Sequence, residues 1–238
     1  MQTEIKLGDI TVDVMLKDIK NIHLSVYPPT GRVRISAPLR FDIDAIRIFA
    51  ISKLAWIKKQ QTKLRHQERE TVREYVERES HYFMGRRYLL KISETDLAPT
   101  VVLRHKEIEL IVKQESTHEQ RRLLLEGWFR QRLRQQIASY VAAWEAKMNV
   151  SVSEFGIKKM RTKWGSCNDE AKRIWINLEL AKKPPECLEY IVVHEMVHLI
   201  ERNHGTRFVS LMDHFLPLWR QHKNLLNNLP VAHTDWQY

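Results

Sequence analysis

Residues 190–198 read Tyr-Ile-Val-Val-His-Glu-Met-Val-His, an apolar run that ends in two histidines and a glutamate. On an α-helix of 3.6 residues per turn, His194 and His198 lie on one face, about 6 Å apart along the axis, which suits two imidazoles that bind one Zn²⁺. Glu195 lies beside that face, where its carboxylate can reach a water at the metal and act as a general base. The stretch therefore predicts a hydrolytic zinc site on a helix.

The residues before this motif favour a helix that starts at Pro184 and Pro185. Proline suits the first turn of a helix, and Glu186 places an acid near its positive N-terminal end. The alternative is a helix whose histidines face solvent and bind no metal. The apolar neighbours of the histidines oppose that alternative, because unpartnered imidazoles in so apolar a helix are costly and a metal supplies the partner.

His204 is the predicted third ligand, six residues after the second histidine of the motif. The spacing matches that of the metzincins, which have glycine where this chain has Glu201. Asn203 tolerates a left-handed conformation and Gly205 follows, so a helix that ends just before them would return His204 to the metal. Glu201 and Asp213 are rival ligands, and in a further alternative His204 only caps the turn.

The composition indicates a compact globular protein, with 238 residues, 43% of them hydrophobic, and only 7 glycines and 8 prolines. That length suits one large or two modest domains. The polar opening residues do not resemble a signal peptide, and no apolar run is long enough to span a membrane, so we expect a cytoplasmic protein and favour a monomer. The two cysteines, Cys167 and Cys187, are predicted to be reduced thiols and not zinc ligands.

The chain carries an excess of positive charge, with 39 Lys and Arg against 29 Asp and Glu and a formal charge of +10. Such an excess favours polyanions or acidic proteins as partners, so DNA is a candidate partner. Six basic residues near the zinc motif form a candidate nucleic-acid surface, and the alternative is an ordinary solvated face. These residues are Lys158, Lys159, Arg161, Lys163, Lys172 and Arg173.

Alternating apolar residues predict strands in the first forty residues, at 5–7, 10–14, 22–26 and 33–35, with the last two as a hairpin. Asp42 or Asp44 is the predicted cap of a helix whose apolar positions continue to Leu64. We expect this helix to run on through 67–79 as a solvated arm, because acids and bases alternate there.

The rest of the chain mixes further strands and helices. Strands are predicted at 83–92 and 101–112, a long core helix over 125–148, and a hairpin from 158–167 and 174–178. A last helix over 208–219 is expected to be kinked or interrupted by Pro217.

Several motifs together resemble one known family. They are 163–167 (KWGSC), 176–178 (INL), 190–199 (YIVVHEMVHL), 203–208 (NHGTRF) and, nearer the N-terminus, 31–38 (GRVRISAP) and 56–57 (WI). This set is similar to the YgjP-like metallopeptidases, which are themselves similar to the WLM and SprT-like zinc proteases. The resemblance implies a zincin-like domain with His194, His198 and His204 as ligands of one zinc and Glu195 as the base. It also favours a gluzincin-like fold, and relatives that cut proteins crosslinked to DNA suggest DNA-associated substrates.

We therefore predict an α+β protein with a small N-terminal sheet portion and a long helix at 1–114, followed by a zincin-like catalytic domain at 115–238. The strand with Trp164, Gly165 and Ser166 is predicted either to pair with an extended peptide substrate or to lie in the interior. Arg207 and His214 are candidates for stabilising the oxyanion.

Peptide hydrolysis by a metal-activated water is the predicted reaction. Two other functions stay open at this point. In one, a nucleic-acid-associated protein uses zinc only to hold its fold. In the other, a zinc hydrolase cuts an amide that is not a peptide bond.

Overall fold

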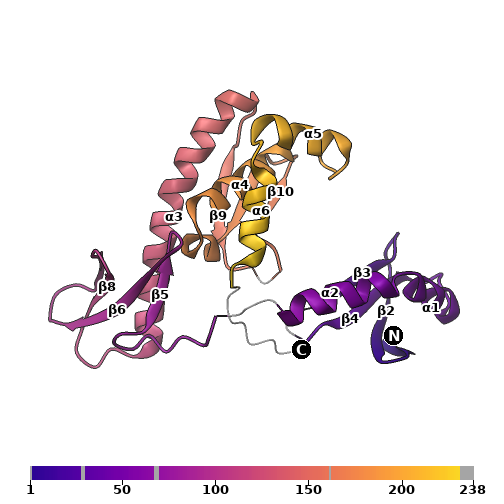
Figure 1. Ribbon diagram of the computed structural model, residues 1–238, viewed down its shortest axis with the longest axis horizontal. Coiled ribbons are helices and arrows are strands. Elements are labelled where there is room, and N and C mark those ends of the chain that lie inside the picture. Colours follow the sequence, from indigo (N-terminus) through magenta and orange to yellow (C-terminus); the bar gives the residue numbers. More distant parts are fainter. Residues whose placement is uncertain (1, 28–29, 67–69, 161, 231–238) are drawn as a thin grey trace. The chain divides into compact units, whose positions relative to one another are not determined.

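The computed structural model describes residues 2–27, 30–66, 70–160 and 162–230. They fall into two compact units, one within Met1–Arg69 and one within Glu70–His233 (Figure 1). Both units combine helices and sheets, so the predicted α+β class is confirmed. Within the described residues, no helix is long and apolar enough to cross a membrane.

The first unit contains a four-stranded sheet in the order β1-β2-β4-β3. Its strands are β1 (Gln2–Leu7), β2 (Ile10–Lys17), β3 (His23–Tyr27) and β4 (Arg32–Pro38). β1 pairs with β2 and β3 with β4 in antiparallel fashion, which confirms the predicted hairpin, while β2 and β4 are parallel. Alternate residues of the sheet form a core with two helices, because one face of each strand is apolar.

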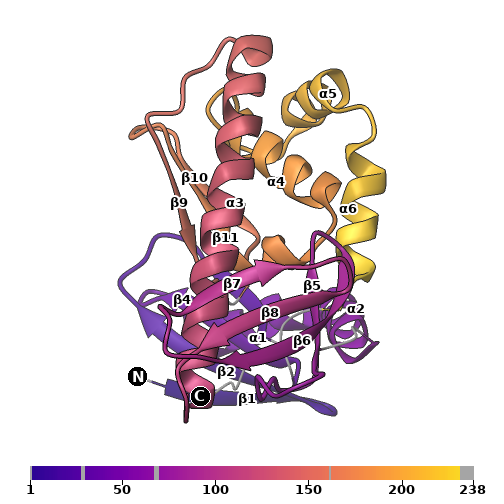
Figure 2. The same cartoon turned by 90° about the vertical axis from the view of Figure 1, so that its left-hand side faces the viewer.

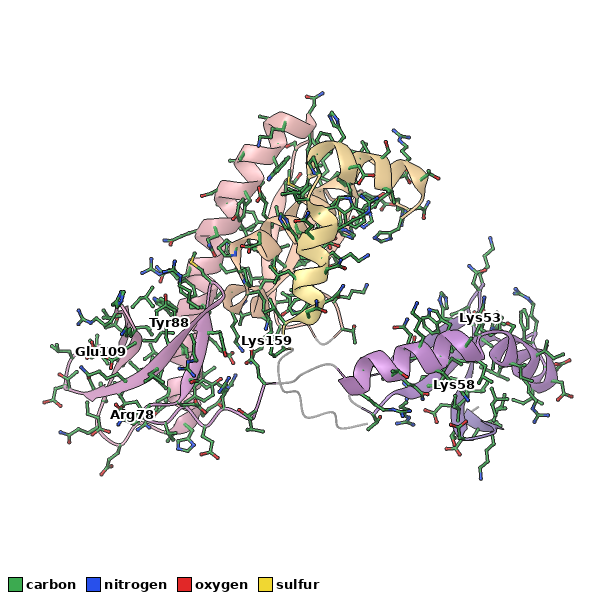
Figure 3. All side chains as sticks on the ribbon, viewed as in Figure 1. Lys53, Lys58, Arg78, Tyr88, Glu109 and Lys159 are labelled. Atoms are coloured by element: carbon green, nitrogen blue, oxygen red, sulfur yellow. The ribbon has the colours of Figure 1, made fainter. Side chains whose placement is uncertain are left out.

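The helical stretch after this sheet is two helices, α1 (Ile43–Ser52) and α2 (Leu54–His66). The Asp42 side chain accepts a hydrogen bond of 2.6 Å from the N–H of Ala45, so Asp42 is the N-cap. Lys53, marked in Figure 3, separates the helices and donates its N–H to the carbonyl of Ala50, three residues earlier. The expectation of one unbroken helix is therefore wrong.

The predicted solvated arm is also wrong for Glu70–Glu79, which is not helical; 67–69 lie outside the described residues. Glu70 is only 9% exposed, and its carboxylate lies 3.5 Å from the ammonium groups of both Lys182 and Lys183. Burial raises the pKa of Glu70, but the two lysines and Arg73 outweigh it and hold the pKa below its ordinary value. The two lysines lie more than 100 residues later in the chain, so the local alternation of charges gives no sign of them.

The second unit begins with a sheet in the order β5-β6-β8-β7. Its strands are β5 (Ser80–Phe83), β6 (Arg86–Glu94), β7 (Thr100–Leu103) and β8 (Glu107–Val112). Figure 3 marks Tyr88 on β6 and Glu109 on β8. Gly85 makes the turn between β5 and β6 at a φ of +75°, and a Cβ there would lie 2.8 Å from Pro184.

The long helix α3 (His118–Met148) joins this sheet to the rest of the unit (Figure 2). Thr117 and Gln120 form a capping box at its start. Phe83 of β5 packs against Trp128 and Phe129 of α3, with ring centroids 4.7 and 6.1 Å apart. Since these residues share one core, the boundary that we expected after residue 114 falls inside the second unit.

The remaining elements include the helix that carries the zinc motif and the strands and helices next to it in the chain. A three-stranded sheet in the order β10-β11-β9 consists of β9 (Glu154–Lys158), β10 (Gly165–Asn168) and β11 (Arg173–Asn177). The antiparallel pair β10 and β11 confirms the predicted hairpin. The helices that follow are η1 (Leu178–Lys182), α4 (Pro185–Val197), α5 (Thr206–Phe215) and α6 (Trp219–Asn228). The break between α5 and α6 confirms the interruption expected at Pro217.

Candidate metal centre and catalytic site

Helix α4 carries the first two histidines and the glutamate. Pro184 is its N-cap and Pro185 its first residue, as the proline pair predicts. Its last helical residue is Val197, and His198 is the C-cap. The helix thus ends earlier than we expected, and the chain is free to turn directly after the second histidine.

His204 lies in the short non-helical segment between α4 and α5. Its Nε2 atom is 3.0 Å from Nε2 of His194, and one ring nitrogen from each of the three histidines lies within 4.8 Å of the others. The turn needs no left-handed residue: Asn203 is not among the residues with positive φ, and Gly205 has a φ of −81°. Instead, α4 ends at Val197, and the chain turns after it so that His204 lies beside His194.

The rival ligands have other partners. The carboxylate of Asp213 accepts a hydrogen bond of 2.7 Å from Trp219 Nε1 and pairs with Arg220. Glu201 accepts a hydrogen bond of 3.1 Å from the N–H of Asn203. Among the described residues, the cluster able to hold a metal consists of the three histidines alone, so it includes neither carboxylate and neither cysteine.

The donor set of the cluster fits Zn²⁺, which binds imidazole nitrogens in catalytic sites. Nδ1 of His198 lies 3.1 Å from the carbonyl oxygen of Glu201, so Nδ1 donates its proton there and Nε2 is left as an acceptor. Burial, helped by His198 and His204, lowers the pKa of His194 to about 3. His194 is therefore neutral at pH 7, as a metal ligand must be.

Phe208 of α5 is a positioning residue that the sequence did not reveal as part of the site. It is 2% exposed, and its ring centroid lies 4.9, 4.8 and 4.7 Å from those of His194, His198 and His204. One aromatic ring thus packs against all three imidazoles and restricts their rotation. In the sequence it ends the motif 203–208 and is one of several apolar residues of a predicted helix, but neither feature shows that its ring contacts the histidines.

The carboxylate of Glu195 is held in a nearly dry environment. The residue is 5% exposed, and burial raises its pKa to about 8, an effect that Lys163 opposes. Gly165 of β10 lies so close that a Cβ there would be 2.5 Å from Oε1 of Glu195. Only glycine leaves room for the carboxylate at this place.

A cavity of about 360 Å³ opens beside these groups. It is lined by Lys163, Gly165, Ser166, Cys167, Asp169, His194, Glu195, His198, Arg202 and His204. Gly165 and Ser166 of the predicted substrate strand line it, whereas Trp164 packs against the hydrophobic core. Neither of the two candidates for stabilising the oxyanion lines the cavity. Arg207 lies 3.9 Å from Glu201, and the ring of His214 contacts that of Phe215.

The structure places five of the six basic residues of the predicted nucleic-acid surface and spreads them over several elements. Arg161 lies outside the described residues. Lys158 and Arg173 are aligned with opposite ends of β11, roughly 13 Å apart at the usual strand rise. Lys159 pairs with Glu126 and Arg173 with Glu154, and the ammonium of Lys158 lies over the ring of Trp175. Lys172 precedes β11 and Lys163 lines the cavity.

The model of the YgjP-like metallopeptidase domain matches residues 20–229 of the chain. The chain belongs to this family. It is therefore a zinc metallopeptidase, a hydrolase that acts on proteins or peptides. The family implies a metal, typically zinc, and the three-histidine cluster supplies a place for it within this YgjP-like domain.

Two solved structures are similar to part of the chain. The metallopeptidase zymogen of Pyrococcus abyssi abylysin aligns with 12% identity and a TM-score of 0.37, over 41% of this chain and 99% of its own. The metallopeptidase zymogen of Methanocaldococcus jannaschii jannalysin aligns with 20% identity and a TM-score of 0.33, over 40% of this chain and 92% of its own. A search of curated proteins found no match.

Proposed function

We propose that this metallopeptidase cuts peptide bonds at one Zn²⁺ held by His194, His198 and His204, with Glu195 as the general base. The observation that carries the proposal is the convergence of these groups on one cavity. Three imidazole nitrogens lie within 4.8 Å of one another, and the buried carboxylate of Glu195 lines the same cavity. A structural zinc site would need no carboxylate beside its ligands.

When bound, Zn²⁺ supplies a Lewis acid that polarises the scissile carbonyl and makes water acidic enough to attack at neutral pH. Glu195 accepts a proton from the attacking water and delivers it to the nitrogen of the leaving amine as the C–N bond breaks. Burial raises the pKa of Glu195 to about 8, and a group whose pKa lies near the working pH can both accept and release a proton readily.

An extended substrate is expected to lie along β10. This strand is at the edge of its sheet, so one side pairs with β11 and the other is free to pair with a peptide backbone. Gly165 and Ser166 place that edge along the cavity. These positions support a role in substrate binding for the two residues, while the core packing of Trp164 favours a structural role for that side chain.

Gly165→Ala tests the closeness of β10 to Glu195. The added Cβ has to push the Glu195 carboxylate aside, so we expect kcat to fall about 10- to 100-fold, as misplacement of a catalytic group by about 1 Å does. Zinc content and Tm are expected to change little. The matched control is Gly127→Ala in α3, where a Cβ meets no atom within 4 Å. Wild-type turnover in Gly165→Ala would contradict this placement of the carboxylate.

DNA-associated proteins are the more specific substrate class that we propose. If the basic residues hold DNA, its affinity falls steeply as salt rises, because each neutralised phosphate releases a counterion. Charge reversal at Lys158, Lys159 and Lys172 should then flatten the dependence of binding on salt and leave zinc content unchanged. Absence of DNA binding at low salt, with no stimulation of cleavage, would contradict the proposal.

The experiment that tests the main proposal compares the cleavage products that a protein mixture yields with the wild-type enzyme and with Glu195→Gln. We expect new termini from the wild type alone, their loss on chelation and their return with zinc. Identical activity in both proteins would favour zinc as a structural element. Cleavage of small amides but of no peptide would favour a hydrolase of another bond.

A further inference from the structure

Three charged side chains of the cavity wall are neither predicted metal ligands nor the predicted base. They are Lys163, Asp169 and Arg202. Asp169 and Arg202 lie 3.9 Å apart, between Oδ2 and Nη1, so their charges offset one another. In the part of the chain that the structure describes, Lys163 makes no ion pair within 4.0 Å. Lys163 acts on the Glu195 carboxylate only through a Coulomb interaction, so among the described residues the wall presents one cation without an ion-pair partner within 4.0 Å to whatever enters the cavity.

The backbone of Lys163 is held by a hydrogen bond from the side chain of Asn177. This asparagine is 4% exposed, and its Nδ2 donates to the carbonyl oxygens of Lys163 and Met160 at 2.8 and 2.9 Å. Its backbone N–H donates to the carbonyl of Trp164 at 2.9 Å. A buried amide that forms these bonds fixes the backbone ahead of β10, so the ammonium group extends from a defined point.

The anchored lysine lies beside the reaction centre. It is two residues before Gly165, which touches Glu195, and it lies at the end of β10 opposite to Asp169. A peptide that pairs with the free edge of β10 therefore passes Lys163 within a few residues of the bond to be cut. Asp169 and Arg202, near the other end of the strand, offer a neutral pair.

We propose that Lys163 is a specificity-determining residue that binds a carboxylate of the peptide substrate, so that the enzyme favours peptides with an acidic group near the scissile bond. The carboxylate belongs either to an Asp or Glu side chain or to the C-terminus of the peptide. This inference rests on the proposed peptide hydrolysis. Because the lysine is exposed to solvent, we expect a preference of about 2- to 5-fold, and we expect salt to weaken it.

The experiment uses zinc-loaded full-length protein and short peptides that differ at one position. Each position around the cleaved bond holds Asp, Asn or Lys, and each peptide is made as a C-terminal acid and as an amide. The readout is the ratio of kcat/KM for Asp over Asn within one variant. A substitution at Lys163 that alters Glu195 changes kcat/KM for every peptide by the same factor. Such an effect therefore cancels in the ratio. The same peptides are also titrated into zinc-loaded Glu195→Gln to obtain the ratio of Kd values.

We expect the wild type to favour Asp at one position, chiefly through KM. Lys163→Gln should bring the ratio close to one, and Lys163→Glu should make Lys the preferred residue. Lys106→Glu is the control for net charge, because this exposed lysine lies between β7 and β8 and does not line the cavity; it should keep the wild-type preference. A preference for acids over amides would identify the peptide terminus as the carboxylate.

The inference is overturned if the wild type prefers neither Asp over Asn nor C-terminal acids over amides, or if the preference that it shows survives Lys163→Glu. Loss of DNA binding in Lys163→Glu with an unchanged peptide ratio would also overturn it, in favour of phosphate recognition. If the wild type cleaves no peptide, the proposed function fails. The Kd ratios measured with and without Lys163→Glu in the Glu195→Gln protein then still decide whether Lys163 selects carboxylates.

Discussion

Glu195→Gln should lower the rate of peptide hydrolysis by a factor on the order of 10² to 10⁴, the usual contribution of a general base. The amide has nearly the same size as the carboxylate but cannot accept a proton from water. Burial raises the pKa of Glu195 to about 8, so the folded state disfavours the charged carboxylate at neutral pH, and the neutral amide should keep or raise the free energy of unfolding. The measurement is steady-state hydrolysis together with zinc content and Tm.

Glu186→Gln is the matched control for this change. It makes the same chemical substitution in the first turn of α4, and Glu186 does not line the cavity. We expect it to keep the wild-type rate. Unchanged turnover in Glu195→Gln would show that another group takes the proton, and the proposed mechanism would have to be abandoned.

His194→Ala and His198→Ala should each abolish zinc binding and activity. Purified wild-type protein is expected to hold close to one zinc per chain, and two remaining imidazoles seldom retain the ion. A metal that binds the folded state raises its stability, by about 4 kcal/mol when free metal is 1,000 times Kd. A chelator should therefore lower the Tm of the wild type and leave that of the two variants unchanged.

The control for the histidine variants is His105→Ala, an exposed histidine outside the cluster, which should keep both the zinc and the response to chelator. His204→Ala is expected to lose zinc as well, because His204 supplies the third imidazole of the cluster. Full zinc occupancy in a His194→Ala, His198→Ala double variant would remove the basis of the metal site.

Much of the fold could be read from local patterns. The strand pairs of the first sheet, the long helix α3 and the hairpin of β10 and β11 all follow from apolar periods of two or 3.6 residues. The patterns failed where a distant partner outweighs the local preference. Glu70 lies in a stretch of alternating charges that looks solvated, yet two lysines beside α4 bury it. No period in the sequence shows such a contact.

In the candidate site, too, some features follow from the sequence and others depend on the tertiary structure. Helical spacing alone places His194 and His198 on one face with Glu195 beside them, because the geometry of an α-helix is the same in any protein. The return of His204 depends on where α4 ends, and the exclusion of Glu201 and Asp213 depends on their partners in space.

Tertiary packing also creates contacts that the spacing of residues in the sequence does not predict. Phe208 packs against all three imidazoles, Gly165 makes room for the Glu195 carboxylate, and Asn177 anchors the backbone of Lys163. Each of these contacts joins residues from separate elements, so it exists only after the elements have packed together. The sequence of one helix thus determines two of the predicted zinc ligands and the predicted base. The side chains that orient these groups come from other elements and reach them only in the folded protein.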